Sequence, residues 1–160
     1  MPDLQAQPCP CTSGKPLGDC CGPCVSGARE PPDAVALMRS RYSAYATGQV
    51  AWLLRSLHHT HPDHRRPPAQ VLHDLAKACR DFKYRGLWIL DHASNPPSAQ
   101  VLFQARLYEK GKDRSFVERS EFLQDGQSWR YLDGKLLPIG AIKGDPKSLT
   151  LATFDASRAV

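Results

Sequence analysis

Apolar residues recur at three- and four-residue steps through the first half of the chain, which is the spacing of one helix face. The first stripe follows Asp33, a residue type that caps helix N-termini, and ends before Gly48. A second stripe occupies residues 50–57, and a third follows Pro67. The pattern predicts three helices. The first presents Ala34, Leu37, Met38, Arg41, Tyr42 and Tyr45 on one face, and the third presents Leu72, Leu75, Cys79 and Phe82.

The second half of the chain changes to a period of two, which is the spacing of β-strands. In residues 99–108 apolar and polar side chains alternate, with Val101 and Phe103 on the same face. Asp125-Gly126 is a strong hairpin-turn signal, and Asp133-Gly134 marks the end of the last strand. The predicted strands are residues 86–92, 99–108, 114–123 and 129–132, and no element is assigned to residues 135–160.

Three helices followed by an antiparallel meander predict an α+β domain, with the helices covering one face of a curved sheet. The chain has 160 residues, of which 41% are hydrophobic and 23% are charged, so it can bury one ordinary core. No apolar stretch has the length of a membrane span, and the N-terminus lacks a secretory signal pattern. These features favour a cytoplasmic protein, in which cysteines stay reduced.

Four cysteines near the start, Cys9, Cys11, Cys20 and Cys21, have the spacing C-x-C-x8-C-C. Four thiolates suit a tetrahedral zinc ion, and a segment this short needs metal binding to fold by itself. Because four protein ligands close the coordination shell, we expect structural Zn²⁺ rather than a catalytic metal. Redox chemistry and another metal are the alternatives, and Cys24 is either a substitute ligand or a free thiol.

One charged residue lies in the middle of the first helical stripe. Arg41 falls among apolar neighbours, and a charge there needs a partner. The alternation of residues 114–123 puts Phe116, Glu118 and Phe122 on the inner face of the sheet. We therefore predict a buried Arg41–Glu118 pair, which is either a structural ion pair or part of a ligand or catalytic site. The aromatic candidates for the lining of such a pocket include Trp52, Trp129 and Tyr131.

A histidine run, LHHTHPDHRR, lies between the second and third predicted helices. It contains Pro62 and is most simply a solvated loop. A second metal site and an anion contact are the alternatives for these histidines. The net charge is +5, falling to about +3 if the cysteines bind one divalent ion. The basic residues are dispersed, which argues against a nucleic-acid groove.

The segment CPCTSGKPLGDCC resembles the SEC-C motif, a zinc-binding module also found in the SecA preprotein translocase. LMRSRYSAY, WLLRSLH, GLWIL, VERSEFL and WRYLDG follow in order, and with them the chain resembles the YchJ-like (UPF0225-type) family. This resemblance implies that Cys9, Cys11, Cys20 and Cys21 bind zinc, and that the rest adopts the cone-shaped fold of nuclear transport factor two, a cystatin-like fold. Thr12 departs from the family pattern, in which a glycine is usual at that position.

The sequence thus predicts two domains, a zinc module at residues 1–27 and a cone domain at residues 28–160. The first functional hypothesis is an adaptor that binds a partner protein, or the ribosome, through the zinc module and its exposed Lys15, Pro16 and Leu17. The second is a small-molecule binder or enzyme, with Glu118 as acid or base and Arg41 as anion anchor. By analogy with relatives of this fold, a homodimer would use the open sheet face, which includes Arg106, Tyr108 and Arg119.

Overall fold

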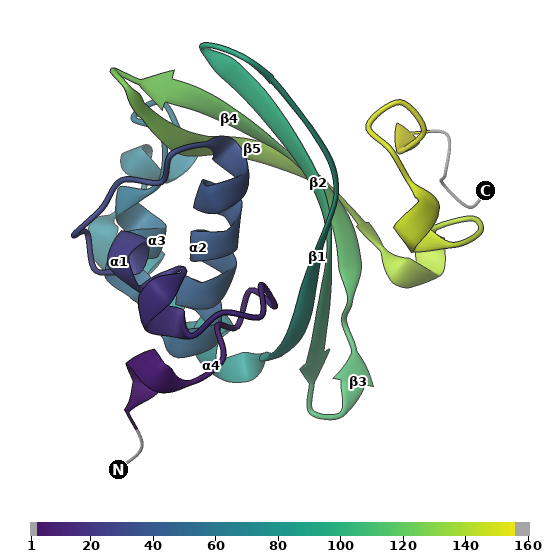
Figure 1. Ribbon diagram of the computed structural model, residues 1–160, viewed down its shortest axis with the longest axis horizontal. Helices are drawn as coiled ribbons and strands as arrows, with labels where there is room; N and C mark the ends of the chain where they lie inside the picture. The colour runs from purple at the N-terminus through teal and green to yellow at the C-terminus, as the bar shows by residue number, and fades with distance from the viewer. Residues whose placement is uncertain (1–2, 156–160) are drawn as a thin grey trace.

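A curved antiparallel sheet holds the helices in its hollow in the computed structural model, which describes residues 3–155 (Figure 1). The expected α+β cone is therefore confirmed. The helices are α1 (Gly22–Val25), α2 (Ala34–Thr47), α3 (Val50–Arg55) and α4 (Pro68–Asp81). The strands are β1 (Lys83–Asn95), β2 (Ser98–Glu109), β3 (Lys112–Asp113), β4 (Phe116–Asp125) and β5 (Ser128–Pro138). Short 3₁₀ turns are η1 (Leu4–Ala6), η2 (Leu17–Asp19), η3 (Pro62–Arg65), η4 (Ile139–Ala141) and η5 (Pro146–Ser148).

The ends of α2 follow from its sequence. The Asp33 carboxylate accepts a hydrogen bond from the Ala36 backbone N–H at 2.7 Å, which caps the first turn. Gly48 takes a left-handed conformation at φ 73° and donates its N–H to the Ala44 carbonyl, which closes the last turn. The predicted helix is confirmed at both ends, and the other two helices also occur where the spacing places them. The face predicted for the third helix is only partly right, because Leu72 is 39% exposed, Val71 is the buried residue, and Phe82 lies just after the helix end.

The sheet has the order β1-β2-β4-β5, with β3 paired to β2, and all its neighbours are antiparallel. Its register shifts twice between β1 and β2 and once between β4 and β5. Such bulges bend the strands and increase their twist. The bending produces the hollow that receives α2, which contacts β1, β2 and β5.

The predicted end of the last strand at Asp133-Gly134 is wrong. β5 continues to Pro138, and Gly134 pairs with Ser120 of β4 inside the ladder. A Cβ on Gly134 would lie 2.6 Å from both Glu118 Cδ and Tyr131 Oη. Glycine occurs here because two neighbouring side chains occupy the space of its missing side chain, and not because the chain turns.

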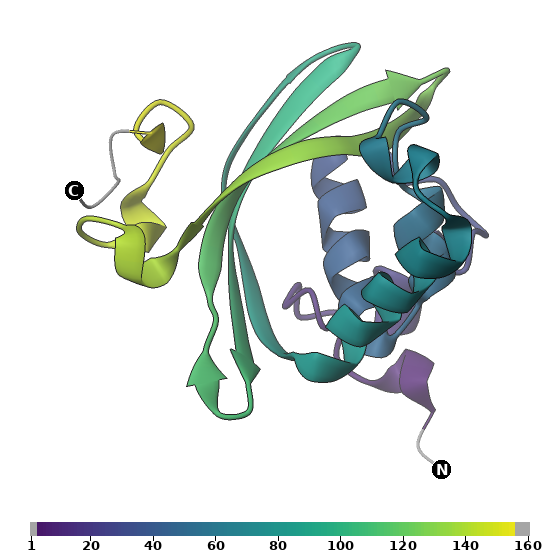
Figure 2. The same ribbon diagram turned by 180° about the vertical axis from the view of Figure 1, so that it is seen from behind.

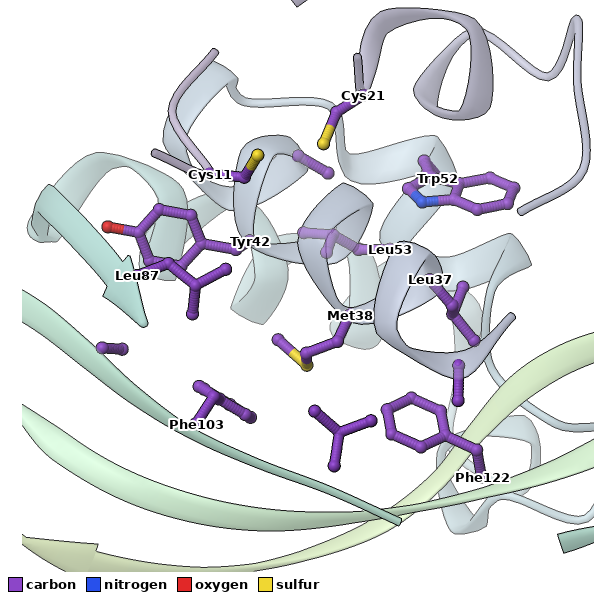
Figure 3. Packing of buried hydrophobic residues seen from close by; sticks show 14 of the residues in the cluster. Cys11, Cys21, Leu37, Met38, Tyr42, Trp52, Leu53, Leu87, Phe103 and Phe122 are labelled. Carbon is purple, nitrogen blue, oxygen red and sulfur yellow. The ribbon is translucent and has the colours of Figure 1, made fainter. Parts of the chain in front are cut away.

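Both faces of the sheet are covered. The concave face packs on the helices, and its buried cluster includes Leu37, Trp52, Phe103 and Phe122 (Figure 3). The inward alternation predicted for residues 114–123 is thereby confirmed at Phe122. On the convex face, a second cluster joins strand residues to the segment that follows β5, and consists of Leu102, Val117, Leu137, Leu149 and Phe154.

The segment 139–155, which the sequence left unassigned, lies on the side of the sheet opposite to the helices (Figure 2). Arg119 on the convex face contacts Asp155 at 3.1 Å, and its guanidinium carbon lies 5.7 Å from the centre of the Phe154 ring. The sheet face near Arg119 is therefore occupied by the chain itself, and the open face that we expected there from the sequence is not present. The homodimer stays a prediction.

The ends of the two predicted domains, residues 1–2 and 156–160, lie outside the described residues. None of the helices between residues 3 and 155 is both long and apolar enough to span a membrane.

Candidate metal centre and ligand pocket

The four N-terminal cysteines lie together around one point. Their sulfur atoms are all within 4.8 Å of one another, with Cys11 and Cys20 3.6 Å apart and Cys20 and Cys21 4.0 Å apart. Sulfur ligands 2.3 Å from an ion at tetrahedral corners would be about 3.8 Å apart. All four are free thiols, so no disulfide competes for them. The geometry therefore suits a tetrahedral metal site.

Three short segments bring these cysteines together. Cys9 is held by a backbone hydrogen bond to Lys15, at 2.8 Å, which closes the loop carrying Cys11. Cys20 follows η2, and Cys21 is the N-cap of α1. The tight turns allow four sulfurs to converge from a sequence of only thirteen residues, Cys9 to Cys21.

Polar groups surround the sulfurs. The Arg39 guanidinium lies 3.6 Å from the Cys11 sulfur and donates to the Cys11 carbonyl at 3.0 Å. The hydroxyls of Ser13 and Ser43 lie 3.1 Å from Cys20 and 3.4 Å from Cys9. Hydrogen bonds from neighbouring thiols, Cys21 first, lower the pKa of Cys11, and the same contact raises the pKa of Cys21. A cation among the sulfurs would allow all four to ionise together.

Thr12 links the cysteine loop to strand β1 through its side chain. Its backbone is left-handed at φ 61°, a conformation that costs a residue with a Cβ about 1 kcal/mol or more. Its hydroxyl is within hydrogen-bonding distance of the Leu87 carbonyl and accepts from the Leu87 N–H at 3.4 Å. The side chain thus fastens the cysteine loop to strand β1, and this contact offsets the backbone strain.

The cysteine segment and the cone share one hydrophobic core. Cys9, Cys11, Leu17 and Cys21 belong to the same buried cluster as the residues of α2. Figure 3 shows Cys11 and Cys21 on the opposite side of the helices from Phe103 and Phe122 of the sheet. The boundary at residue 27 stays a prediction, but the cysteine segment is packed on the cone and shares its core. Leu17, which we expected on its displayed surface, is 4% exposed.

Cys24 is not part of the four-sulfur cluster. It lies on α1, is buried, and burial raises the pKa of its thiol. Together with Cys79 on α4, it is a free thiol outside the candidate metal site.

A cavity of about 450 Å³ opens in the cone between α2, α4 and the sheet. Arg41, Glu118 and Tyr131 all line it. Trp52 and Trp129, the other two candidates, do not: they belong to the buried core, where the Trp52 indole N–H donates to Ser40 at 2.9 Å. The cavity is lined by Met38, Arg41, Tyr42, Tyr45, Ala78, Phe82, Tyr84, Phe103, Ala105, Leu107, Arg114, Phe116, Glu118, Tyr131 and Leu136.

The predicted direct ion pair between Arg41 and Glu118 does not form. Arg41 donates to the Leu53 carbonyl at 2.9 Å and to the Ser56 hydroxyl at 2.5 Å, and its guanidinium lies 4.5 Å from the centre of the Tyr131 ring. The Tyr131 hydroxyl donates to Glu118 at 3.2 Å. Tyr131 therefore connects the two charged side chains, with its ring on Arg41 and its hydroxyl on Glu118. Sequence reasoning missed this because the contact depends on where β5 crosses the cone.

Glu118 lies in an environment that disfavours its charge. Burial raises the pKa of its carboxyl, while hydrogen bonds from Ser120 and Tyr131 and the charge of Arg41 oppose the rise. The net direction is upward, so Glu118 holds its proton to a higher pH than an exposed glutamate. Raised carboxyl pKa values in a cavity are typical of functional sites.

We expect Gly134→Ala to lower the free energy of unfolding by about 2 kcal/mol, because the new Cβ would overlap Glu118 and Tyr131. Urea unfolding measures the change. Gly140→Ala is the matched control, since a Cβ at that position meets nothing within 4 Å. Equal effects of the two substitutions would contradict the packing described for Gly134.

Sequence reasoning missed three tyrosines of the pocket, Tyr42, Tyr45 and Tyr84. Tyr42 and Tyr45 were assigned to the core stripe of the first helix. Tyr42 accepts from the Gly86 N–H at 2.8 Å, and Tyr84 donates to the Ala78 carbonyl at 3.0 Å. The hydroxyls of Tyr42 and Tyr45, at helical spacing beside Arg41, were the available signal for these two, since fully apolar packing would not need them.

The histidine run is only partly the solvated loop that we expected. His58 is 5% exposed and its backbone N–H donates to the Tyr131 carbonyl at 2.8 Å, whereas His59 and His64 are exposed. His58 and His59 come together with Asp125, their candidate ligand atoms lying within 4.8 Å of one another. The loop thus contacts β5 next to the pocket. A second metal site and an anion contact stay predictions.

Comparison with known proteins agrees with this fold. Residues 33–134 match the family model described as the YchJ middle NTF2-like domain. A UPF0225 protein of Methylibium petroleiphilum is 38% identical over 140 residues, covering 86% of this chain and 96% of that protein. A UPF0225 protein of Geobacter sulfurreducens is 36% identical, covering 79% of this chain and 77% of that protein.

Two solved structures are similar. The solution structure of a SEC-C motif containing protein from Rhodopseudomonas palustris has a TM-score of 0.68 and 27% identity, covering 81% of this chain and 98% of that one. The crystal structure of a SEC-C motif containing protein from Psychrobacter arcticus has a TM-score of 0.66 and 20% identity, covering 91% and 92%. The second likeness concerns the fold alone.

Proposed function

Because this chain belongs to the YchJ-like UPF0225 family, with that family's NTF2-like domain at residues 33–134, we propose that it binds a small molecule in the cone and holds a zinc ion in the four-cysteine site. The cavity of about 450 Å³ next to Arg41 and Glu118 is the observation that carries the proposal. Small-molecule sites typically enclose about 300–1,000 Å³, with mainly apolar walls and a few polar groups.

Zinc in the cysteine site has a structural role in this proposal. Four thiolates close the shell of the ion, so no position is left for a substrate. The sulfur separations fit zinc, which is the ion that the resemblance of the cysteine segment to the SEC-C motif implies. The ion would fasten Cys9, Cys11, Cys20 and Cys21 against α2, and so fix the helix that carries Arg41.

The adaptor function expected from the sequence is the second candidate. A groove of about 170 Å³ beside Cys20 supports it, because Lys15, Asp19, Arg29 and Arg39 line the groove and would suit a polar partner. The burial of Leu17 leaves that surface less apolar than we expected. In a pull-down, Lys15→Glu should then remove a partner that Lys147→Glu leaves bound.

Native mass spectrometry of the purified protein tests the leading proposal. We expect the chain with one zinc ion and with a small molecule that denaturation releases. Ala78→Phe should lose the small molecule and keep the zinc, because Ala78 lines the cavity on α4. Ala51→Phe, at an exposed helical alanine, should keep both. A ligand retained equally by both variants would place it outside the cone and contradict the proposal.

A further inference from the structure

Three polar groups of the cone pocket have unused hydrogen-bonding capacity. Glu118 Oε2 accepts from Ser120 and Tyr131, but Oε1 has no hydrogen bond with any residue between 3 and 155. The Tyr45 hydroxyl also has no hydrogen bond within this part of the chain, although Tyr45 lines the cavity. Arg41 uses only Nη1 for its contacts with Leu53 and Ser56.

These groups lie close together and are mainly donors. Arg41 and Glu118 both act electrostatically on Tyr45, and Arg41 acts on Glu118. A guanidinium keeps its charge, and a protonated carboxyl and a phenol each present an O–H. A ligand group that satisfies all three must therefore accept hydrogen bonds, and the fixed positive charge favours an anion.

Apart from Arg114 and the other tyrosines, the walls of the cavity are apolar and largely aromatic. Phe82 directly follows α4, while Phe103, Leu107 and Phe116 come from β2 and β4. Phe103 and Phe116 meet edge to face, with ring centres 6.1 Å apart. Such walls bury a hydrocarbon or aromatic body and offer it no hydrogen bonds.

We propose, as a refinement that rests on the function proposed above, that the ligand is a monocarboxylate with an apolar body. Its carboxylate lies between Arg41, Tyr45 and the Glu118 carboxyl, and its body lies against the phenylalanines. One carboxylate neutralises the Arg41 guanidinium. The other cation that lines the cavity, Arg114, is half exposed and already pairs with Glu109, so the lining offers no unpaired cation for the second charge of a dianion. An amine would meet Arg41 directly. A neutral apolar molecule would leave Arg41 and Tyr45 unpaired.

Proton binding is coupled to such a ligand. A carboxylate can bind beside Glu118 only while Glu118 carries its proton, because two adjacent carboxylates repel each other. Other titratable or charged side chains face this end of the cavity or lie near it. They are Arg41 and Tyr45 from α2, Cys79 from α4, Tyr84 from β1, Arg114 from the connection before β4, Tyr131 and Asp133 from β5, and His61 and Asp63 from the histidine loop. Affinity should therefore fall as the pH rises through the pKa of Glu118, which lies above its ordinary value of 4.5.

Calorimetric titration with matched ligands tests the proposal on the metal-loaded protein. One set is naphthalene-2-carboxylate, naphthalen-2-ylmethanol and naphthalen-2-ylmethylamine, and the other is dodecanoate, dodecanol and dodecylamine. In at least one set we expect the carboxylate to bind about tenfold more tightly than the alcohol at a pH below the pKa of Glu118, and the amine to bind weakest. Above the pKa of Glu118, the Kd of the carboxylate should rise about tenfold per pH unit.

Two variants distinguish an effect on ligand binding from an effect on the stability of the fold. Glu118→Gln should keep carboxylate binding and lose its pH dependence, because the amide stays neutral and still donates. Tyr45→Phe should weaken the carboxylate about fivefold with an unchanged Tm, since its hydroxyl has no hydrogen bond within residues 3–155.

The outcomes distinguish the two proposals. Alcohols that bind as tightly as the carboxylates, or carboxylate binding with the same pH profile in Glu118→Gln, would overturn the ligand class and leave a small-molecule pocket in place. If all six compounds fail to bind and no small molecule co-purifies, both proposals are wrong.

Discussion

Replacing Cys11 with serine is expected to remove the metal from the four-cysteine site and to lower the free energy of unfolding by about 4 kcal/mol or more. Cys11 is fully buried, and it lies between the other sulfurs and Arg39. In small zinc modules, metal binding supplies about 10–16 kcal/mol of folding free energy. Only part of that is lost here, because Leu17 and Thr12 also attach the segment to the cone.

Metal analysis and thermal unfolding measure this effect. Cys79→Ser is the matched control, because Cys79 is a half-buried thiol outside the cluster, and it should keep one zinc ion per chain. In the unaltered protein, a chelator should make four of the six thiols newly reactive. If Cys11→Ser kept its metal and its stability, the four cysteines would not form the site described here.

Arg41→Met should lower the free energy of unfolding by about 3 kcal/mol. The substitution leaves the buried Leu53 carbonyl and the Ser56 hydroxyl without their charged donor, and it removes the cation from the Tyr131 ring. Arg65→Met is the control, since Arg65 is exposed, and its effect should stay below about 0.5 kcal/mol.

The cost of Arg41→Met should also depend on pH. Burial raises the pKa of Glu118 above 4.5, so ionising it in the folded protein costs stability as the pH rises. Arg41 opposes that cost, and its removal raises the pKa further. The difference between the two proteins should therefore be larger at pH 8 than at about pH 4, as urea unfolding at both values would show. A difference that stayed constant would mean that Arg41 does not act on Glu118.

Much of the fold could be predicted because its signals are local. The Asp33 cap, the Gly48 terminator and the two-residue period of β2 each depend on neighbouring residues only. The convergence of the four cysteines was also local, because they lie within one short segment. Such features are specified by hydrogen bonds and side-chain directions within a few residues.

The remaining features depend on contacts between distant residues. Asp133-Gly134 has the composition of a turn, but the fold uses Gly134 to make room for Glu118 and Tyr131. For Arg41 and Glu118, the pattern correctly predicted that both side chains lie at the same cavity. The predicted direct contact was wrong, since Tyr131 of β5 lies between them. A pattern of residues along a helix or strand predicts the face on which a side chain lies. It does not predict which residue of another element that side chain will contact.

The segment after β5 has a practical consequence for handling this protein. Its anchors are Leu149 and Phe154, which are buried against Leu102 and Val117 of the sheet. Proteolysis between Lys143 and Leu149 would let the segment after the cut dissociate from the sheet. The apolar residues that it covers would then be exposed to other molecules. Truncation of the chain here would favour aggregation. Expression vectors should therefore include all residues through Asp155, and an affinity tag is better fused at the N-terminus.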